Sequence, residues 1–150
     1  MEKGEIAENN FKQGYNCAQA VAAAFAEEMG MTPEQAARLV SGFGGGFGRM
    51  REVCGAVSGM VFVLSALRGG GAAADNESKA ALYAAVQKVM KTFAAQNGSY
   101  ICGELLGVKP RSDGPEPTPR TPEFYKKRPC NELVRTAAEI VARELTGTPQ

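Results

Sequence analysis

The four cysteines of this 150-residue chain are its best candidates for chemistry, because the chain contains no histidine. They are Cys17, Cys54, Cys102 and Cys130. Each lies at or just before the start of a segment that we predict to be helical. The first backbone N–H groups of a helix have no intrahelical partner and carry partial positive charge, so they stabilise a nearby thiolate. Since the thiolate is the reactive and metal-ligating form of cysteine, this placement indicates sulfur chemistry.

The spacing of the cysteines excludes any local site, because the sequence contains neither CxxC nor CxxxxC. The absence of these motifs excludes two kinds of site: the short chelating loop of zinc fingers and the vicinal dithiol of thioredoxin-like enzymes. A shared site must therefore be assembled by the tertiary fold. Four converging thiolates would hold Zn²⁺ or an iron–sulfur cluster, with helix N-termini offsetting the negative charge. The alternative is that the cysteines are small buried hydrophobic residues, as free cysteine often is.

Cys54 is the strongest single candidate. It follows a glycine-rich segment and two basic residues, Arg49 and Arg51, whose charges would add to the stabilisation of a thiolate. The small residues after it leave space around the sulfur, or they serve tight helix packing; local features do not separate these two interpretations. We predict Cys54 and Cys17 as the catalytic thiols, and all four cysteines as the ligands of any cofactor or metal.

The charge composition narrows the range of partners. The chain has 17 basic and 16 acidic residues, a formal net charge of +1, which gives no support for nucleic-acid binding or for a polybasic membrane anchor. The absence of histidine excludes hydrolases with a Ser-His-Asp or Cys-His arrangement. We expect a small molecule or a redox partner protein, and the sequence does not predict the oligomeric state.

The N-terminal residues are polar and lack the apolar stretch of a secretory signal, so we expect a cytoplasmic protein. The most apolar run, from Val53 to Leu67, is 15 residues long, short of the roughly 18 that a membrane-spanning helix needs. It predicts a buried core helix without membrane insertion. Because a reducing compartment keeps structural disulfides open, a cytoplasmic location favours redox catalysis or metal ligation.

Hydrophobic periodicity and capping residues predict one all-α domain over residues 1–150, a compact bundle of about five helices. The expected helices cover about 17–30, 32–40, 54–67, 76–96 and 130–145, with a short helical turn at 102–106. Two loops interrupt them: a glycine-rich one at 42–48 and a proline-rich, extended one at about 109–129. The glycine-rich loop lacks GxGxxG and GxxxxGK[ST], so we expect a hinge or a close backbone approach to the cysteines.

The pattern of Cys17, then Cys54-Gly55-Ala56-Val57-Ser58-Gly59, then Cys102 and Cys130 resembles a family described as redox-active and named for its cysteines, C_GCAxxG_C_C. The likeness covers about residues 11–141. The family label writes its central motif GCAxxG, whereas this chain has the form CGAxxG. The resemblance implies a redox role without a settled substrate. A similar domain occurs in cytochromes that carry an iron–sulfur centre, which favours a cluster here, but this chain lacks the CxxCH motif for haem attachment.

We therefore predict a redox protein in which the four cysteines converge, either cycling between thiols and disulfides or ligating an iron–sulfur cluster that transfers electrons. The main alternative is a non-catalytic zinc-binding or interaction module with structural cysteines. A third interpretation is a plain helical domain with scattered buried thiols. The expected cofactor is accordingly an iron–sulfur cluster, zinc or none.

Overall fold

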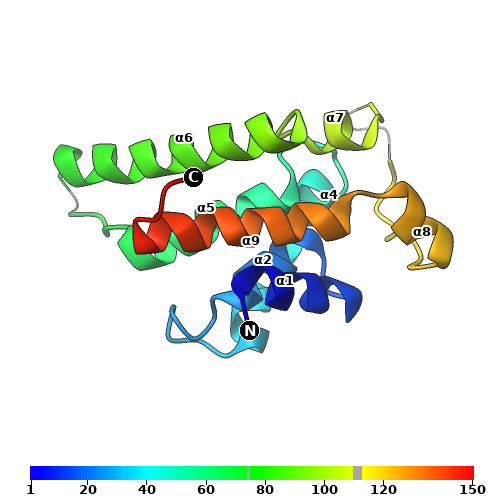
Figure 1. Cartoon of the computed structure of the whole chain (residues 1–150), viewed down its shortest axis with the longest axis horizontal. Helices are drawn as coiled ribbons and strands as arrows, with labels where there is room; N and C mark the ends of the chain where they lie inside the picture. The colour runs from blue at the N-terminus through cyan, green and yellow to red at the C-terminus, as the bar shows by residue number, and fades with distance from the viewer. Residues whose placement is uncertain (74, 110–112) are drawn as a thin grey trace.

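The chain is built from helices (Figure 1). The structure is a computed structural model and describes residues 1–73, 75–109 and 113–150. Its elements, in chain order, are α1 (Lys3–Lys12), α2 (Cys17–Ala24), α3 (Pro33–Leu39), the 3₁₀ helix η1 (Ser41–Phe43), α4 (Gly44–Phe47), α5 (Gly55–Arg68), α6 (Asn76–Asn97), α7 (Cys102–Leu106), α8 (Pro122–Lys127) and α9 (Cys130–Thr146). The predicted all-α class is confirmed, but the described residues form more helices than the five or so that we predicted.

Local capping signals set several of the helix starts. At α2 and α3 the side chains of Asn16 and Thr32 each accept a hydrogen bond from the backbone N–H three residues later, and the glutamine there bonds back to the cap. Asp75 caps α6 in a similar way by accepting from the Ser78 N–H at 2.7 Å. Because these contacts join residues close in sequence, sequence analysis predicted these three starts well.

Four helices in the described part of the chain were not predicted. Two of them are short, η1 and α4, and lie in the segment predicted to be a glycine-rich loop, where Gly45 and Gly46 have positive φ. The other two are α1 and α8. α1 has a largely polar sequence, but it buries Gly4, Ala7 and Phe11, whose spacing of three and four residues forms one face of a helix. α8 lies in the segment predicted to be extended; Thr121 caps it and Pro122 takes its first position, where proline is tolerated. The prediction of an extended loop is therefore wrong for 122–127, and its residues 110–112 lie outside the described part of the chain.

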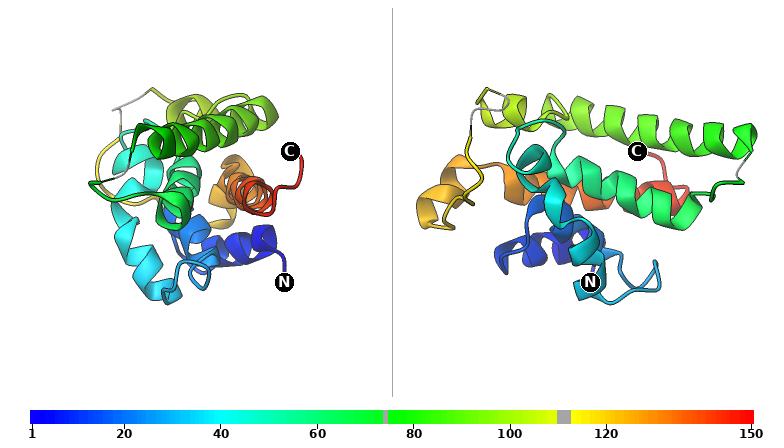
Figure 2. Two further views of the ribbon diagram at one scale, coloured as in Figure 1. Left: turned by 90° about the vertical axis from the view of Figure 1, so that its left-hand side faces the viewer. Right: turned by 180° about the vertical axis from the view of Figure 1, so that it is seen from behind.

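Helix α2 is shorter than predicted and lies at the centre of the packing. It ends at Ala24 rather than near residue 30, and it contacts α1, α3, α5 and α9. On the other side of the bundle, α6 lies along α5 and α9, as the views in Figures 1 and 2 agree. Fully buried side chains from α1, α2, α5, α6 and α9 form the core, and examples are Phe11, Val21, Met60, Phe93 and Ile140.

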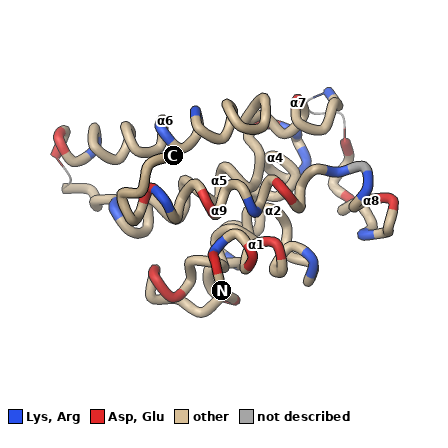
Figure 3. Tube along the Cα trace, viewed as in Figure 1, with Lys and Arg blue, Asp and Glu red and all other residues tan. Residues whose placement is uncertain are grey.

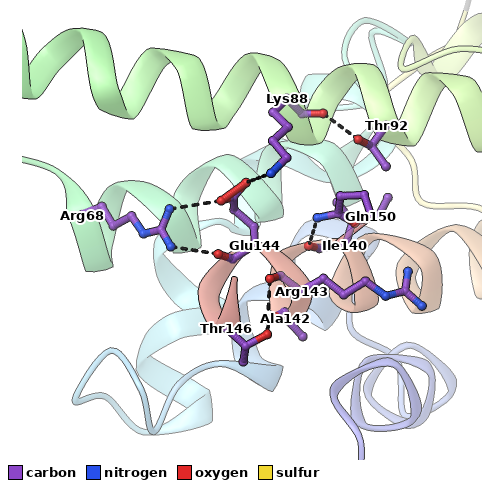
Figure 4. Close-up of polar contacts among 9 residues, drawn as sticks. All are labelled: Arg68, Lys88, Thr92, Ile140, Ala142, Arg143, Glu144, Thr146 and Gln150. Carbon is purple, nitrogen blue, oxygen red and sulfur yellow. Dashed lines mark hydrogen bonds and ion pairs between the residues drawn. The ribbon is translucent and has the colours of Figure 1, made fainter. Parts of the chain in front are cut away.

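An ion-pair cluster joins three helices at the C-terminal end of α9 (Figure 4). The carboxylate of Glu144 lies 3.4 Å from Nη1 of Arg68 in α5 and 3.2 Å from Nζ of Lys88 in α6. Arg68 also donates from Nη2 to the backbone oxygen of Glu144 at 2.9 Å. These contacts tie α5 and α6 to the last turns of α9.

Among the described helices, none has both the length and the apolar character of a membrane-spanning helix.

Candidate functional site

All four cysteines lie at the starts of helices and line one small cavity. Cys17, Cys102 and Cys130 are the first residues of α2, α7 and α9, and Cys54 is the residue that precedes α5. The cavity has a volume of about 30 Å³ and is also lined by Arg51 and by leucines of α7 and α9. The fold therefore brings together all four residues that the sequence singled out, although long segments separate them along the chain.

The two glycines of the CGAxxG motif allow α5 to pack closely on α2. A Cβ atom at Gly59 would lie 2.9 Å from Cβ of Val21, and one at Gly55 would lie 3.2 Å from Cβ of Cys17. Larger side chains would push the helices apart, because real Cβ contacts are rarely this short. The motif glycines thus serve helix packing, and this packing holds the start of α5, with Cys54, against the start of α2.

Backbone hydrogen bonds place α7 beside α5. The Cys54 N–H donates to the Tyr100 oxygen at 2.9 Å, and the Cys102 N–H donates to the Glu52 oxygen at 2.6 Å. The two residues that precede these cysteines form an antiparallel bridge. This pairing fixes Cys102 next to the segment that carries Cys54.

The glycine-rich segment passes directly behind the cysteines. Gly46 has a φ of +74°, and a Cβ atom there would lie 2.7 Å from both the Cys102 Cβ and the Glu52 nitrogen. Left-handed backbone conformations cost an L-residue about 1–2 kcal/mol, so glycine is favoured at this position. Non-glycine residues with positive φ also cluster here and concentrate strain beside the site. They are Phe47, Arg49 and Arg51.

Arg51 is a buried cation at the wall of the cavity. Only 3% of its surface is exposed. Its Nε donates to Oδ2 of Asp113 at 2.7 Å, and its Nη1 donates to Sγ of Cys102 at 3.6 Å. Within the described residues its Nη2 is buried and has no hydrogen-bond partner. Sequence analysis associated Arg51 with Cys54, whereas the guanidinium contacts Cys102.

Burial keeps two of the four thiols protonated at neutral pH. It raises the pKa of Cys54 to about 12, although the backbone N–H groups of Ala56 and Val57 act in the opposite direction. Burial also raises the pKa of Cys102, even though Arg51 donates a hydrogen bond to its sulfur. At these two positions, desolvation raises the pKa of the thiol more than the helix N-terminus lowers it.

The pKa values of Cys17 and Cys130 shift in opposite directions because the two thiols interact. A hydrogen bond from the Cys17 thiol lowers the pKa of Cys130 to about 7, with Arg128 and Arg120 adding to the effect and burial opposing it. The same hydrogen bond, followed by burial, raises the pKa of Cys17 well above its ordinary value. The favoured ionised state is therefore a Cys130 thiolate that accepts a hydrogen bond from a Cys17 thiol.

These pKa values favour a different nucleophile from the one that the sequence analysis predicted. The assignment of Cys54 and Cys17 as catalytic thiols stays a prediction, and the pKa directions favour Cys130 over Cys54 as the nucleophile. A local signal for Cys130 exists, because Arg128 stands two residues before it. The larger contribution, from Cys17, comes from the opposite end of the sequence and required the fold.

A larger cavity of about 340 Å³ adjoins the cysteine cavity. Cys17 and Cys130 are half-buried and line both cavities, whereas Cys54 and Cys102 are buried and line only the inner one. Four arginines contribute to the lining of this outer cavity: Arg49, Arg51, Arg120 and Arg128. Basic segments around α4 and between α8 and α9 gather at this end of the bundle (Figure 3).

The described residues contain no group of side chains placed as metal ligands. Across residues 1–73, 75–109 and 113–150, no three cysteine or acidic side chains are grouped as they would be around a metal ion. In addition, the guanidinium of Arg51 contacts the Cys102 sulfur on one side of the cavity. The iron–sulfur and zinc assignments stay predictions, and we derive no chemical step from either.

Comparison with known proteins finds a family but no individual relative. No curated protein matches the chain, and no solved structure matches it. The family described as "Putative redox-active protein (C_GCAxxG_C_C)" matches residues 15–144, a range that contains all four cysteines. The match covers most of the chain, and the chain therefore belongs to this C_GCAxxG_C_C family of redox-active proteins.

Proposed function

We propose that the protein is a thiol–disulfide oxidoreductase whose working pair is Cys130 and Cys17. The observation that carries this proposal is that Cys17 and Cys130 are the two cysteines that line both the inner and the outer cavity. The interaction of the two thiols, with Arg128 and Arg120 nearby, lowers the pKa of Cys130 to about 7. Both residues are half-buried and line the outer cavity, so a substrate in that cavity reaches them directly. A thiolate with a pKa near neutral pH is well suited to thiol–disulfide exchange.

The proposed reaction oxidises the cysteine pair and reduces a disulfide, RSSR. The Cys130 thiolate attacks one sulfur of RSSR, forms a mixed disulfide and expels RS⁻, which takes up a proton from solvent. Cys17 loses its proton to solvent, attacks the Cys130 sulfur and expels the second RS⁻. The products are an internal Cys17–Cys130 disulfide and two RSH molecules, and a dithiol reductant resets the pair.

The other two cysteines are assigned a supporting role. Cys54 and Cys102 are buried, and the raised pKa of each keeps it protonated at neutral pH. Since an un-ionised thiol is a poor nucleophile, neither starts the exchange. Their packing closes the inner side of the cavity and excludes water from the Cys17–Cys130 pair.

Product analysis of cysteine variants tests the proposal. The reduced full-length chain is mixed with the neutral reagent bis(2-hydroxyethyl) disulfide, released thiol is counted, and the protein is mapped by mass spectrometry. The wild type is expected to release two thiols per chain and to form the Cys17–Cys130 disulfide. Cys17→Ser should release one thiol and retain a mixed disulfide on Cys130, whereas Cys130→Ser should not react.

Cys54→Ser is the matched control, because it changes a cysteine of the same cavity that lies away from the outer opening. It should still release two thiols and form the same disulfide. If Cys54→Ser abolished the reaction while Cys130→Ser retained it, the assignment of the nucleophile would be wrong. Stoichiometric iron or zinc bound to the anaerobically purified protein through its cysteines would contradict the dithiol mechanism itself.

A further inference from the structure

The outer cavity has a strongly basic lining. Its described lining residues include four arginines and no aspartate or glutamate. One acidic residue outside the lining, Asp113, pairs with Arg51 at 2.7 Å and lies 4.0 Å from Arg49, and Arg128 also helps to lower its pKa. One carboxylate balances only one of the four positive charges of the described lining. With about 340 Å³, the cavity is at the lower end of the roughly 300–1,000 Å³ range of small-molecule sites.

Two of the four arginines bind neighbouring segments of the chain through hydrogen bonds. Arg49 donates to the Gly114 oxygen at 2.9 Å and to Oγ1 of Thr118 at 2.7 Å. Arg120 donates from both terminal nitrogens to backbone oxygens of α1 and the turn after it, at 2.8 and 3.0 Å. These contacts hold the segment that precedes α8 over the cavity and consume much of the hydrogen-bonding capacity of both side chains.

The other two arginines retain capacity for a ligand. Nη2 of Arg51 is buried without a hydrogen-bond partner in the described chain, and Arg51 lines the cavity. Arg128 lies over the Phe124 ring at 5.7 Å and forms no ion pair with a described acidic residue. Burying a guanidinium N–H without a partner costs free energy, which a bound anion would recover. These groups favour a ligand with negative charge.

We propose that the outer cavity binds a small disulfide that carries carboxylate groups, and that Arg51 and Arg128 select it. This inference rests on the proposed thiol–disulfide function of Cys130 and Cys17. Guanidinium groups bind carboxylates through charge-assisted hydrogen bonds. The cysteine pair belongs to the same cavity lining, so a disulfide held by its carboxylates presents its S–S bond to Cys130.

The same positive charges assist the chemical step. When Cys130 attacks the substrate, its negative charge moves onto the leaving sulfur, and the S–S bond of the substrate breaks as the Cys130–S bond forms. Arginines that line the cavity stabilise this charge on the leaving thiolate until it is protonated by water. When Cys17 displaces the second half of the substrate, the second thiolate leaves through the same basic cavity.

A panel of three disulfides tests this selectivity. The full-length reduced protein is reacted with dithiodipropionate, with its uncharged diamide and with the dication cystamine, and the second-order rate constant of each is corrected for the reagent's reaction with a small thiol. We expect the anion to react faster than the diamide by about tenfold or more, and the diamide faster than the dication. This preference should shrink at about 1 M salt, where the screening length is about 3 Å.

A charge-matched pair of variants locates the effect. Arg128→Gln should lower the ratio of anion to diamide rate constants by about threefold or more. Arg143→Gln removes one positive charge near the opposite end of α9, close to the ion-pair cluster of Figure 4, and should leave the ratio unchanged. The ratio of the two rate constants isolates selectivity, because a change in the reactivity of Cys130 itself alters both rate constants equally and cancels. Arg51→Lys keeps the charge but removes Nη2, and should lower the ratio if this variant folds.

The outcomes separate the two proposals. Equal rate constants for the three reagents, or an unchanged ratio in Arg128→Gln, would overturn the selectivity for carboxylates while leaving thiol–disulfide exchange intact. A wild-type protein whose Cys130 reacts with none of the three reagents would instead overturn the proposed function on which the inference rests.

Discussion

The two ends of the helix bundle use arginine in opposite ways. Near the C-terminal ends of α5 and α9, Arg68 bonds both the carboxylate and the backbone oxygen of Glu144, and Lys88 shares that carboxylate (Figure 4). Around the start of α9, four arginines line the outer cavity, and the described ion pairs there join only Asp113 to Arg51 and Arg49. Nη2 of Arg51 is buried without a hydrogen bond. One end therefore pairs its cations with a shared carboxylate, whereas the other gathers more arginines around the cysteines than its described carboxylate balances.

This difference separates stability from function. The ion-pair end holds three helices together with partly exposed charges that satisfy one another. The cysteine end combines a buried cation whose Nη2 has no described hydrogen-bond partner with positive φ at non-glycine residues, and both features cost folding free energy. Costly features of this kind persist where they contribute to activity, so we assign the chemistry to the cysteine end.

The largest expected effect is the contrast in reactivity between Cys130 and Cys54 within the cysteine end. Near pH 7 Cys130 is partly ionised, because its pKa is lowered to about 7, whereas Cys54 is almost fully protonated, because burial raises its pKa to about 12. The lower intrinsic nucleophilicity of the more acidic thiolate reduces the expected rate ratio to about 10²–10³. Peptide mapping after brief iodoacetamide labelling should show Cys130 reacting first, with a rate that rises through pH 7 and levels off above it.

The sign of this pH dependence follows from the lowered pKa. Below about pH 7 Cys130 is protonated and unreactive, and raising the pH through 7 creates the thiolate. The control is the chain unfolded in denaturant, in which all four cysteines should react alike with the pH dependence of an ordinary thiol. Preferential labelling of Cys54 in the folded protein would contradict the assignment and support the expectation drawn from sequence.

Sequence analysis succeeded where structure is determined locally. Capping residues and apolar periodicity correctly predicted where α2, α3 and α5 begin, although α2 ends at Ala24 rather than near residue 30. The prediction failed in the proline-rich segment, because proline disfavours helix interiors but is accepted at the first position of α8. Helix α1 was missed because its buried face holds only a few small or apolar residues, which become informative once α2 and α9 cover them.

Sequence analysis predicted which residues form the site, but not which of its thiols ionises. Their positions at predicted helix starts identified all four cysteines as candidate site residues, and the structure brings all four to one cavity. The acidity of Cys130 depends most on Cys17, which lies at the opposite end of the sequence, whereas the nearby Arg128 and Arg120 add smaller contributions. Burial, another tertiary property, reverses the expected effect of the helix start at Cys54. Local sequence contains neither the contribution of Cys17 nor the burial of Cys54.

A substitution in the glycine-rich segment should damage the cysteine end through its backbone. Gly46→Ala would place Cβ 2.7 Å from both the Cys102 Cβ and the Glu52 nitrogen, at a φ of +74°. Because the backbone contact cannot move aside cheaply, we expect a loss of about 3 kcal/mol in the free energy of unfolding. Urea unfolding measures the loss, and iodoacetamide labelling of Cys130 and Cys102 should show that the site has become more accessible.

Gly48→Ala is the matched control for this prediction. Gly48 also has a positive φ, of +58°, but nothing lies within 4 Å of its Cβ position. This variant should lose only the conformational contribution, about 1 kcal/mol, and keep the labelling pattern of the wild type. Equal losses in the two variants would mean that the close approach of Gly46 to Cys102 does not constrain the cysteine end.

The smallest expected effect lies at the ion-pair end. Glu144→Gln removes the charge that Arg68 and Lys88 share, but their side chains are 39% and 56% exposed, and Arg68 keeps its bond to the backbone oxygen. Solvent screening limits the expected loss in the free energy of unfolding to about 0.5–1 kcal/mol, declining at high salt. Glu139→Gln, which removes a pair with Arg135 inside α9 itself, should cost less because that pair joins no second helix.

Cys130 should be labelled at the wild-type rate in both variants. A slower rate in Glu144→Gln would show that the ion-pair end also positions the start of α9, and the division of stability and chemistry between the two ends would then be wrong.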